Sequence, residues 1–221
     1  MLQSDHYELL DKLRFGKNSD ERKEALNVLI NFEYEARFDA ADFLKLLADD
    51  DPVYQVYAIG AIGRQKVNAG ISELKRIYAS SSDTMILNEL LTAFLQFETD
   101  DFLDIVVEKL KKLSRKPWVF QTRLRASGSV SDKTFILNQI LIPSLRYIQI
   151  AGNATVEKTA RLFLDHEDAN VRWHALMVFD KLEIALKPDI VSQIKESDSS
   201  PLVRELATLL IEKRGSNAVT S

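Results

Sequence analysis

The chain lacks cysteine and has few residues that break helices, and each shortage excludes a class of structure. Without cysteine there can be no disulfide bond, no thiolate metal site and no cysteine nucleophile. The absence fits a reducing compartment, and we expect a cytoplasmic protein. Only 7 glycines and 5 prolines occur in 221 residues, which argues against an all-β fold rich in turns. The composition favours an all-α fold, because Leu, Ala, Lys and Glu suit helices.

Long apolar runs and an excess of positive charge are missing too. The apolar run 135–142 is too short to span a bilayer and contains Asn138 and Gln139, so we interpret it as buried core and expect no membrane association. The N-terminus lacks the basic and then apolar pattern of a secretory signal. The formal net charge is −4. A nucleic-acid-binding protein is usually basic, so this balance disfavours nucleic acid as a partner.

One pattern recurs along the chain: a polar residue that can cap a helix, followed by an apolar stripe at helical spacing. The copies begin at Ser19, Asp51, Asp83, Lys116, Asp168 and Ser200. Their spacing is 32 or 33 residues, except for a gap of 52 residues after Lys116. A period in this range with two helices per copy indicates a helical solenoid, in which stacked helix pairs bury faces that one pair cannot bury alone.

These copies resemble the HEAT-repeat family, in particular its short bacterial form, which runs Asp-Pro-x-Val-Arg-x-x-Ala-x-x-Ala-Leu-Gly. The matching residues are Asp51, Pro52, Ala58, Ala61 and Gly63, then Asp168, Val171, Arg172 and Ala175, and finally Pro201, Val203, Arg204 and Ala207. The resemblance implies a right-handed α-solenoid of about six helical hairpins. We expect one domain over residues 1–214, with an irregular unit at about 116–164 and a flexible tail at 215–221.

The resemblance also implies roles for the polar residues of the motif. In such repeats the Asp and Arg side chains form bonds between neighbouring units, so Asp51, Asp168, Arg172 and Arg204 are expected to be structural. The helix that carries the motif lines the concave face of the solenoid in this family. On that geometry the candidate partner-binding residues are Tyr57, Trp118, Arg125, Trp173, His174 and Met177. The alternative is that Trp118 and Trp173 are core residues between units.

Two further features lie between the third copy and the fifth. A basic run extends from Lys109 to Arg125. It is either a solvated helix face or a patch for an acidic partner or a phosphate backbone. A long apolar helix is expected over 132–150, and Pro143 should kink or split it because proline removes one backbone hydrogen bond.

No catalytic or metal-binding constellation is found. The histidines His6, His166 and His174 do not form an HExxH motif, and no phosphate-binding glycine loop or nucleophile elbow occurs. In alkylpurine DNA glycosylases, which are also helical-repeat proteins, a catalytic Asp lies one turn after a Trp. Thr122 and Met177 occupy those positions here. We therefore expect no catalytic residue, no metal and no cofactor.

The sequence thus favours a protein that is not an enzyme: a scaffold, adaptor or immunity-type module that binds a partner protein on its concave face. This role rests on analogy with the fold alone. One alternative is a phycobilin lyase-like or phycobilisome-related factor, since the short bacterial HEAT form also occurs in those proteins. Another is nucleic-acid binding through the run 109–125. No small-molecule substrate is evident.

Overall fold

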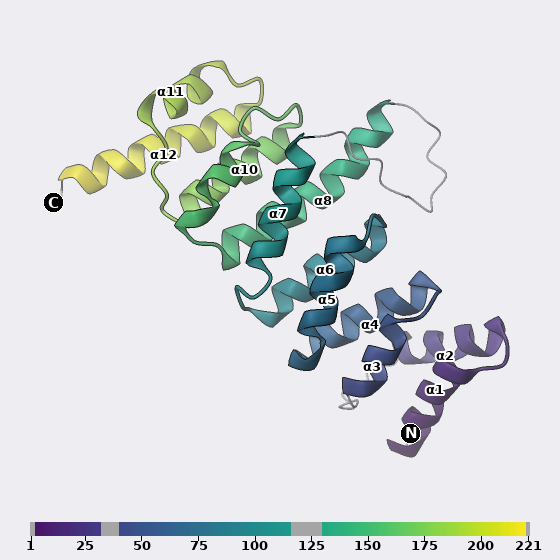
Figure 1. The fold of residues 1–221 in the computed structure, drawn as a ribbon. Helices are drawn as coiled ribbons and strands as arrows, with labels where there is room; N and C mark the ends of the chain where they lie inside the picture. Colours follow the sequence, from purple (N-terminus) through teal and green to yellow (C-terminus); the bar gives the residue numbers. More distant parts are fainter. Residues whose placement is uncertain (1–2, 32–39, 116–129, 220–221) are drawn as a thin grey trace. The chain divides into compact units, whose positions relative to one another are not determined.

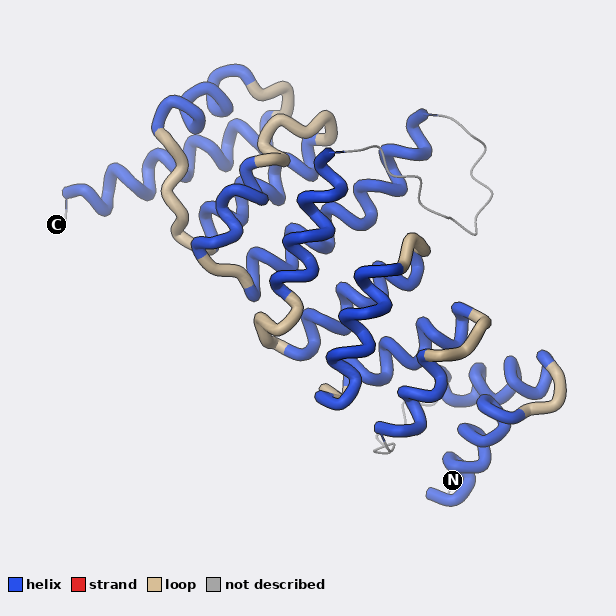
Figure 2. The backbone as a smooth tube through the Cα atoms, in the orientation of Figure 1, coloured by secondary structure: helices blue, strands red, loops and turns tan. Residues whose placement is uncertain are grey.

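The structure is a computed structural model that describes residues 3–31, 40–115 and 130–219. Over these ranges the chain forms twelve α-helices and two short 3-10 helices, and no strand occurs in them (Figure 2). The all-α class is therefore confirmed. The α-helices are α1 (Gln3–Phe15), α2 (Ser19–Asn31), α3 (Ala40–Leu47), α4 (Pro52–Arg64), α5 (Ile71–Ser80), α6 (Thr84–Phe97), α7 (Leu103–Arg115), α8 (Val130–Ala151), α9 (Glu157–Arg161), α10 (Ala169–Lys181), α11 (Pro188–Ser197) and α12 (Pro201–Val219).

The chain divides into two compact units, Met1–Arg76 and Ile77–Ser221. In the first unit α1 packs against α2, and α3 packs against α4 (Figure 1). In the second unit α6, α8, α10 and α12 contact one another in succession. A second set of helices covers them: α7 packs on α8, α9 packs on α10, and α11 packs on α12. The single domain over residues 1–214 stays a prediction.

Aromatic side chains hold the start of the second unit together. Phe94 of α6 stacks on Phe102 with ring centroids 3.9 Å apart. It also meets Tyr78 at 5.2 Å and Tyr147 at 6.1 Å in edge-to-face contacts. All four side chains are buried. The Tyr147 hydroxyl donates to the Thr99 carbonyl at 2.8 Å, so its one polar atom is satisfied. This cluster ties α5, α6 and α8 to the segment that precedes α7.

Three predicted caps are confirmed. The Asp51 carboxylate accepts from the Val53 N–H at 3.0 Å, and Asp83 accepts from Met85 at 2.8 Å. Asp168 accepts from Asn170 at 2.7 Å. Each bond satisfies a first-turn N–H that has no partner within its own helix, which is why the chain starts α4, α6 and α10 at these positions.

A turn of one kind precedes each of these helices and α12. In it, the N–H of the residue just before the helix donates to the side chain two residues earlier. The four bonds are Asp51 to Asp49 at 2.9 Å, Asp83 to Ser81 at 3.1 Å, Asp168 to His166 at 3.1 Å and Ser200 to Asp198 at 2.8 Å. The sequence does not reveal this recurrence, because Asp, Ser and His share only the ability to accept a hydrogen bond.

The predicted cap at Ser19 is wrong. Asn18 caps α2 instead, because its Oδ1 accepts from the N–H groups of Asp20 at 3.1 Å and Glu21 at 2.8 Å. Ser19 is then the first helical residue. Asn and Ser are about equally favourable caps, so composition could not choose between adjacent positions. With Asn18 as the cap, Arg22 occupies the place in α2 that Arg172 occupies in α10.

Replacing Asn18 tests this assignment. We expect Asn18→Ala to lower the free energy of unfolding by about 1 kcal/mol, because two first-turn N–H groups lose their acceptor. Ser19→Ala removes an exposed side chain and should change it by less than about 0.5 kcal/mol. Urea unfolding of the two variants measures the difference. A larger loss for Ser19→Ala than for Asn18→Ala would contradict the assignment.

The structure also bears on the expectations for Pro143 and for the end of the chain. α8 is one continuous helix that includes Pro143, so proline does not split it; the kink stays a prediction. Pro143 is half-buried and Gln139, one turn earlier, is exposed, so the carbonyl that loses its partner is on the solvent side. α12 runs past Gly215 to Val219, because an interior glycine costs only about 1 kcal/mol.

In the described part of the chain, no helix combines the length and apolarity that a membrane crossing needs.

Candidate functional site

The candidate site lies on α10, whose two sides differ in burial. One side is buried in the second unit and carries Val171, Ala175, Leu176, Val178 and Phe179. On the other side Trp173, His174 and Met177 are half-buried. Trp173 and Met177 are four residues apart, so their side chains are neighbours on one helix face. A large aromatic ring and a flexible thioether are therefore presented together at the surface.

The seam between α8 and α10 holds His174 in place. Gln149 Nε2 of α8 donates to the His174 carbonyl at 2.8 Å and lies 3.2 Å from His174 Nδ1. The rings of Trp173 and His174 meet edge to face, with centroids 4.9 Å apart. Burial and then the positive charge of Arg146 lower the pKa of His174. The His174 imidazole is therefore neutral at pH 7. Gln149 contacts it on one side and the ring of Trp173 on the other.

Three of the six predicted site residues lie on one helix of the second unit. Trp173, His174 and Met177 are all half-buried on α10, so Trp173 is neither a fully buried core residue nor an exposed one. Tyr57 is half-buried on α4 in the other compact unit, and burial raises its pKa to about 12. Trp118 and Arg125 lie outside the described residues.

Sequence reasoning missed the contribution of α8 to this face. Arg146 and Ile150 are exposed, and Gln149 reaches His174. Their spacing at i, i+3 and i+4 could have placed them on one side of a helix. The register of α8 against α10 could not be read, because the two helices are joined through a stretch of irregular length.

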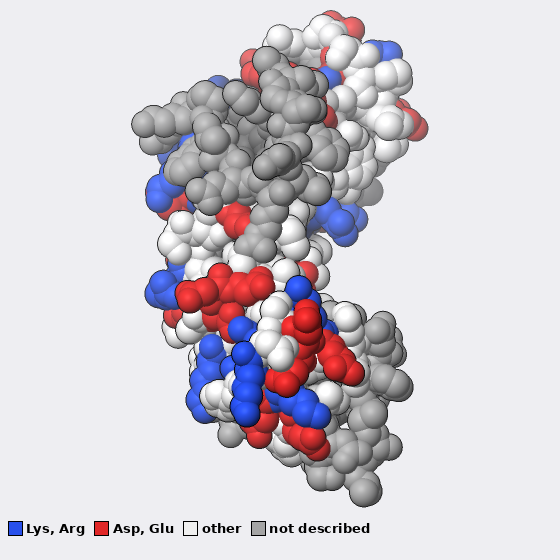
Figure 3. Space-filling model, turned by 90° about the vertical axis from the view of Figure 1, so that its right-hand side faces the viewer, with Lys and Arg blue, Asp and Glu red and all other residues white. Residues whose placement is uncertain are grey.

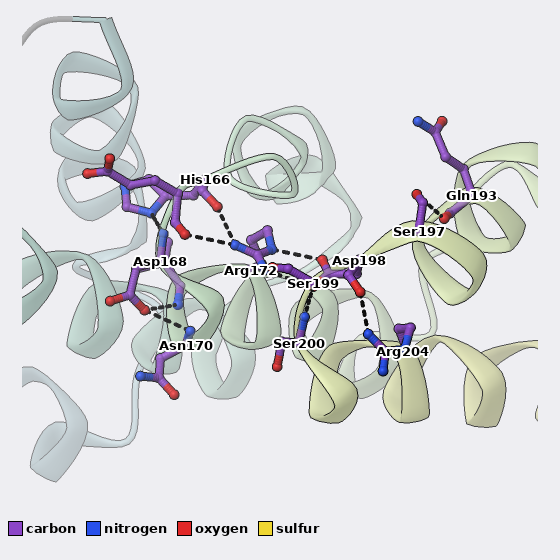
Figure 4. Close-up of polar contacts among 12 residues, drawn as sticks. His166, Asp168, Asn170, Arg172, Gln193, Ser197, Asp198, Ser199, Ser200 and Arg204 are labelled. Carbon is purple, nitrogen blue, oxygen red and sulfur yellow. Dashed lines mark hydrogen bonds and ion pairs between the residues drawn. The ribbon is translucent and has the colours of Figure 1, made fainter.

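Arg172 uses all its hydrogen-bond donors inside the protein (Figure 4). Nε and one terminal nitrogen donate to the two oxygens of Asp198 at 2.8 and 2.7 Å. That same terminal nitrogen donates to the Ser199 hydroxyl at 3.1 Å, and the other donates to the carbonyls of His166 at 2.7 Å and Glu167 at 3.0 Å. A guanidinium has five N–H groups, so none is left for a ligand. Arg172 is thus structural, as expected.

The same bonds join each hairpin to the next. The hydrogen bonds from Arg172 hold the pKa of Asp198, which lies just before α12, below its ordinary value. Arg204 of α12 donates to the Asp198 carbonyl at 2.5 Å, and Asp168 accepts from Asn138 of α8 at 2.7 Å. Asp168 thus contacts the preceding helix pair, as expected for a bond between units, whereas Arg204 binds the turn before its own helix.

The first unit contains the counterpart of this link. Arg22 of α2 pairs with Asp49, which lies just before α4. Gln55 of α4 donates to the Asp49 carbonyl at 2.6 Å, as Arg204 does to the Asp198 carbonyl. Two hairpin junctions far apart in the sequence therefore share one arrangement of polar bonds.

A cleft of about 610 Å³ lies beside this network, between α9 and α11. Arg161, His166, Arg172, Gln193 and Asp198 are among its lining residues. Both guanidinium groups are paired, since Arg161 contacts Glu157 at 2.5 Å and Arg172 contacts Asp198. His166 Nδ1 accepts the N–H of Asp168, which ties this ring to the turn before α10. The polar groups of the cleft thus serve the fold, and we assign it no ligand.

The basic run does not form an open positive patch where it is described. Lys109 Nζ is directed into the protein and donates to the carbonyls of Tyr78 at 2.5 Å and Ser81 at 2.9 Å, near the end of α5. Lys112 pairs with Glu108 at 3.4 Å. Residues 116–129 of the run are outside the described ranges. On the face in Figure 3, positive and negative side chains are intermixed.

Lys109 should make stability depend on alkaline pH. Burial lowers its pKa to about 8, against about 10.4 in an unfolded chain. Between these two pKa values the unfolded state binds more protons than the folded state. The free energy of unfolding should therefore rise with pH, by up to about 1.4 kcal/mol per pH unit. Above about pH 10 stability should fall, because burial raises the pKa of Tyr78 and Tyr147 and only their unfolded forms ionise.

Urea unfolding at about pH 7.5, 8.5 and 9.5 checks this expectation. The lowest pH is below the pKa of Lys109 in the folded state, and the other two lie between its folded and unfolded pKa values. Lys109→Met should remove the rise. Lys158→Met, at an exposed lysine of α9, should keep it. A rise that persists in Lys109→Met would show that another group titrates.

Within the described ranges, no three His, Asp or Glu side chains are grouped so that they could hold a metal ion. Known families give no further guide to the site: no family model matches this chain. A search of curated proteins also found no match. The resemblance to HEAT repeats therefore rests on the sequence motif of this chain alone.

Proposed function

We propose that this chain is a non-catalytic protein-binding module, built as an α-solenoid of HEAT-like helical hairpins. In this proposal the partner protein binds along the row formed by α6, α8, α10 and α12. The centre of the binding site is the half-buried pair Trp173 and Met177, together with His174. Scaffold, adaptor and immunity-type proteins all bind another protein, and the proposal covers this shared property.

Two observations support the repeat architecture. The helices α6, α8, α10 and α12 contact one another in chain order, as second helices of stacked hairpins would. The turn before the helix recurs at Asp51, Asp83, Asp168 and Ser200 with the same hydrogen bond. The turns are 32 residues apart within the pairs Asp51 and Asp83, and Asp168 and Ser200, and the recurrence of one local bonding pattern is what stacked repeats predict.

The observation that carries the binding proposal is the half-buried side of α10. Trp173 and Met177 are partly accessible although the opposite side of the same helix is buried. Tryptophan is among the residues that contribute most to binding energy at protein interfaces, and methionine adapts its shape to a partner. Further exposed apolar side chains lie on neighbouring helices of the row: Ile150 on α8, and Leu202 and Leu209 on α12.

Truncating the pair tests the proposal. In affinity capture from the lysate of the source cell, Trp173→Ala/Met177→Ala should retain at least about thirtyfold less of the partner, the effect of losing a 2 kcal/mol hot spot. Leu162→Ala is the control, because Leu162 is an exposed apolar side chain outside the row, just after α9. Circular dichroism verifies that all variants fold. Equal capture by the wild type and the double variant would contradict the site.

Nucleic-acid binding is not proposed, because Lys109 and Lys112 are engaged within the protein. No described feature favours a bilin, so the phycobilin lyase-like alternative stays a prediction from the resemblance.

A further inference from the structure

Arg146 lies near His174 and has no ion-pair partner among the described residues. It is exposed on α8, and none of the salt bridges of the described chain includes it. Gln149, three residues further along α8, forms the hydrogen bonds to His174. Residues three apart are neighbours on a helix, so Arg146 stands at the same seam between α8 and α10 as His174.

On α8 and α10, few other charges are available to Arg146. It is the only charged residue in the stretch 138–151 of α8. On α10, Arg172 is buried in its network, and Asp180 is paired with Lys213 at 3.0 Å. His174 is held neutral by burial and by Arg146 itself. On α8, Arg146 is therefore an exposed positive charge whose helix neighbours are the amide of Gln149 and the apolar side chain of Ile150, at the seam where α10 presents Trp173 and Met177.

Such an arrangement selects a negative partner group. A guanidinium binds a carboxylate through two parallel hydrogen bonds, and the interaction strengthens when apolar neighbours exclude water. Apolar side chains around it offer contacts to the rest of the bound segment. A partner surface with a positive charge at this point would be repelled, so the same residue also gives specificity.

We propose that Arg146 binds a carboxylate of the partner protein, so that the segment bound at the α8–α10 seam is apolar with an acidic residue. This inference rests on the proposed function, since it names the chemistry of the partner at that same site. It goes beyond that function by predicting which partner sequences bind.

A library of random peptides displayed on phage supplies a probe of known sequence. It is selected on the full chain, on Arg146→Glu and on Lys195→Glu, which makes the same charge change at an exposed position on α11. Selected peptides are then synthesised with each Asp or Glu intact or replaced by Asn or Gln. Binding is followed by fluorescence in a Trp118→Phe background, where Trp173 is the only tryptophan left.

We expect peptides from the full chain and from Lys195→Glu to combine acidic and apolar residues. Arg146→Glu should weaken their binding at least about tenfold, and so should removing the acid from the peptide. The two losses should not add, because they remove the same contact. Arg146→Lys should restore part of the affinity.

Four outcomes would overturn the inference. The selected peptides could need Trp173 but lack acidic residues, or they could bind Arg146→Glu as well as Lys195→Glu. Either result would support the proposed protein-binding site but contradict a carboxylate contact at Arg146. Peptides unaffected by Trp173→Ala would remove the proposed site as well. Binding of a single-stranded oligonucleotide that Arg146→Glu abolishes would assign Arg146 to a phosphate instead.

Discussion

Replacing Arg172 with Met lowers the free energy of unfolding by about 3–5 kcal/mol, the expected cost of removing one partner from a buried ion pair. The side chains of Arg172 and Asp198 are only 9% and 7% exposed. The substitution leaves the Asp198 carboxylate without its main partner and strips donors from the carbonyls of His166 and Glu167. Most of the loss is the cost of these groups left buried and unpaired.

An exposed ion pair provides the control for Arg172. Arg76 contacts Glu73 at 2.5 Å, but its side chain is 65% exposed. Arg76→Met should therefore cost less than about 1 kcal/mol. Urea unfolding of the two variants gives the comparison. Equal losses of unfolding free energy in the two variants would mean that the hydrogen bonds of Arg172 do not stabilise the packing of the last two hairpins.

Truncating Phe94 is the second large change. Phe94→Ala should destabilise the second unit by about 3–5 kcal/mol, because it leaves a cavity where three other rings meet. Phe102 loses its stacking contact, and Tyr78 and Tyr147 lose edge contacts. Phe94→Leu retains most of the buried volume and should cost less than half as much.

Leu162→Ala is the control for Phe94→Ala, because it removes apolar atoms from a side chain that is exposed instead of buried. Leu162 is 51% exposed, so its truncation should change stability by less than about 0.5 kcal/mol. Thermal and urea unfolding, each followed by circular dichroism, measure these variants. A loss for Phe94→Ala no greater than that for Leu162→Ala would contradict the role of the aromatic cluster.

The helices and most of their starting points could be predicted from the sequence because the signals are local. Asp51, Asp83 and Asp168 cap the helices that follow them, as the carboxylate at that position predicts. The prediction failed where two good caps are adjacent, at Asn18 and Ser19. It failed again at Gly215, where a local helix-breaking tendency did not end α12.

The candidate site could be predicted only in part, because it joins two helices. The spacing of Trp173, His174 and Met177 on α10 was enough to place them on one face. The contact of Gln149 with His174, and with it the position of Arg146, depends on how α8 packs against α10. A sequence period indicates which segments are equivalent, but it does not give the register between neighbours when one unit is irregular.

Site-specific photo-crosslinking in the source cell tests the central claim most directly, because it reports contact with a partner at a chosen position. Met177 on the proposed face and Leu162 outside the row are each replaced by the photoreactive residue p-benzoylphenylalanine. The proposal predicts a covalent adduct with a partner protein from position 177 and none from position 162. Adducts from position 162 alone would place the interface on the other set of helices and contradict the proposed site.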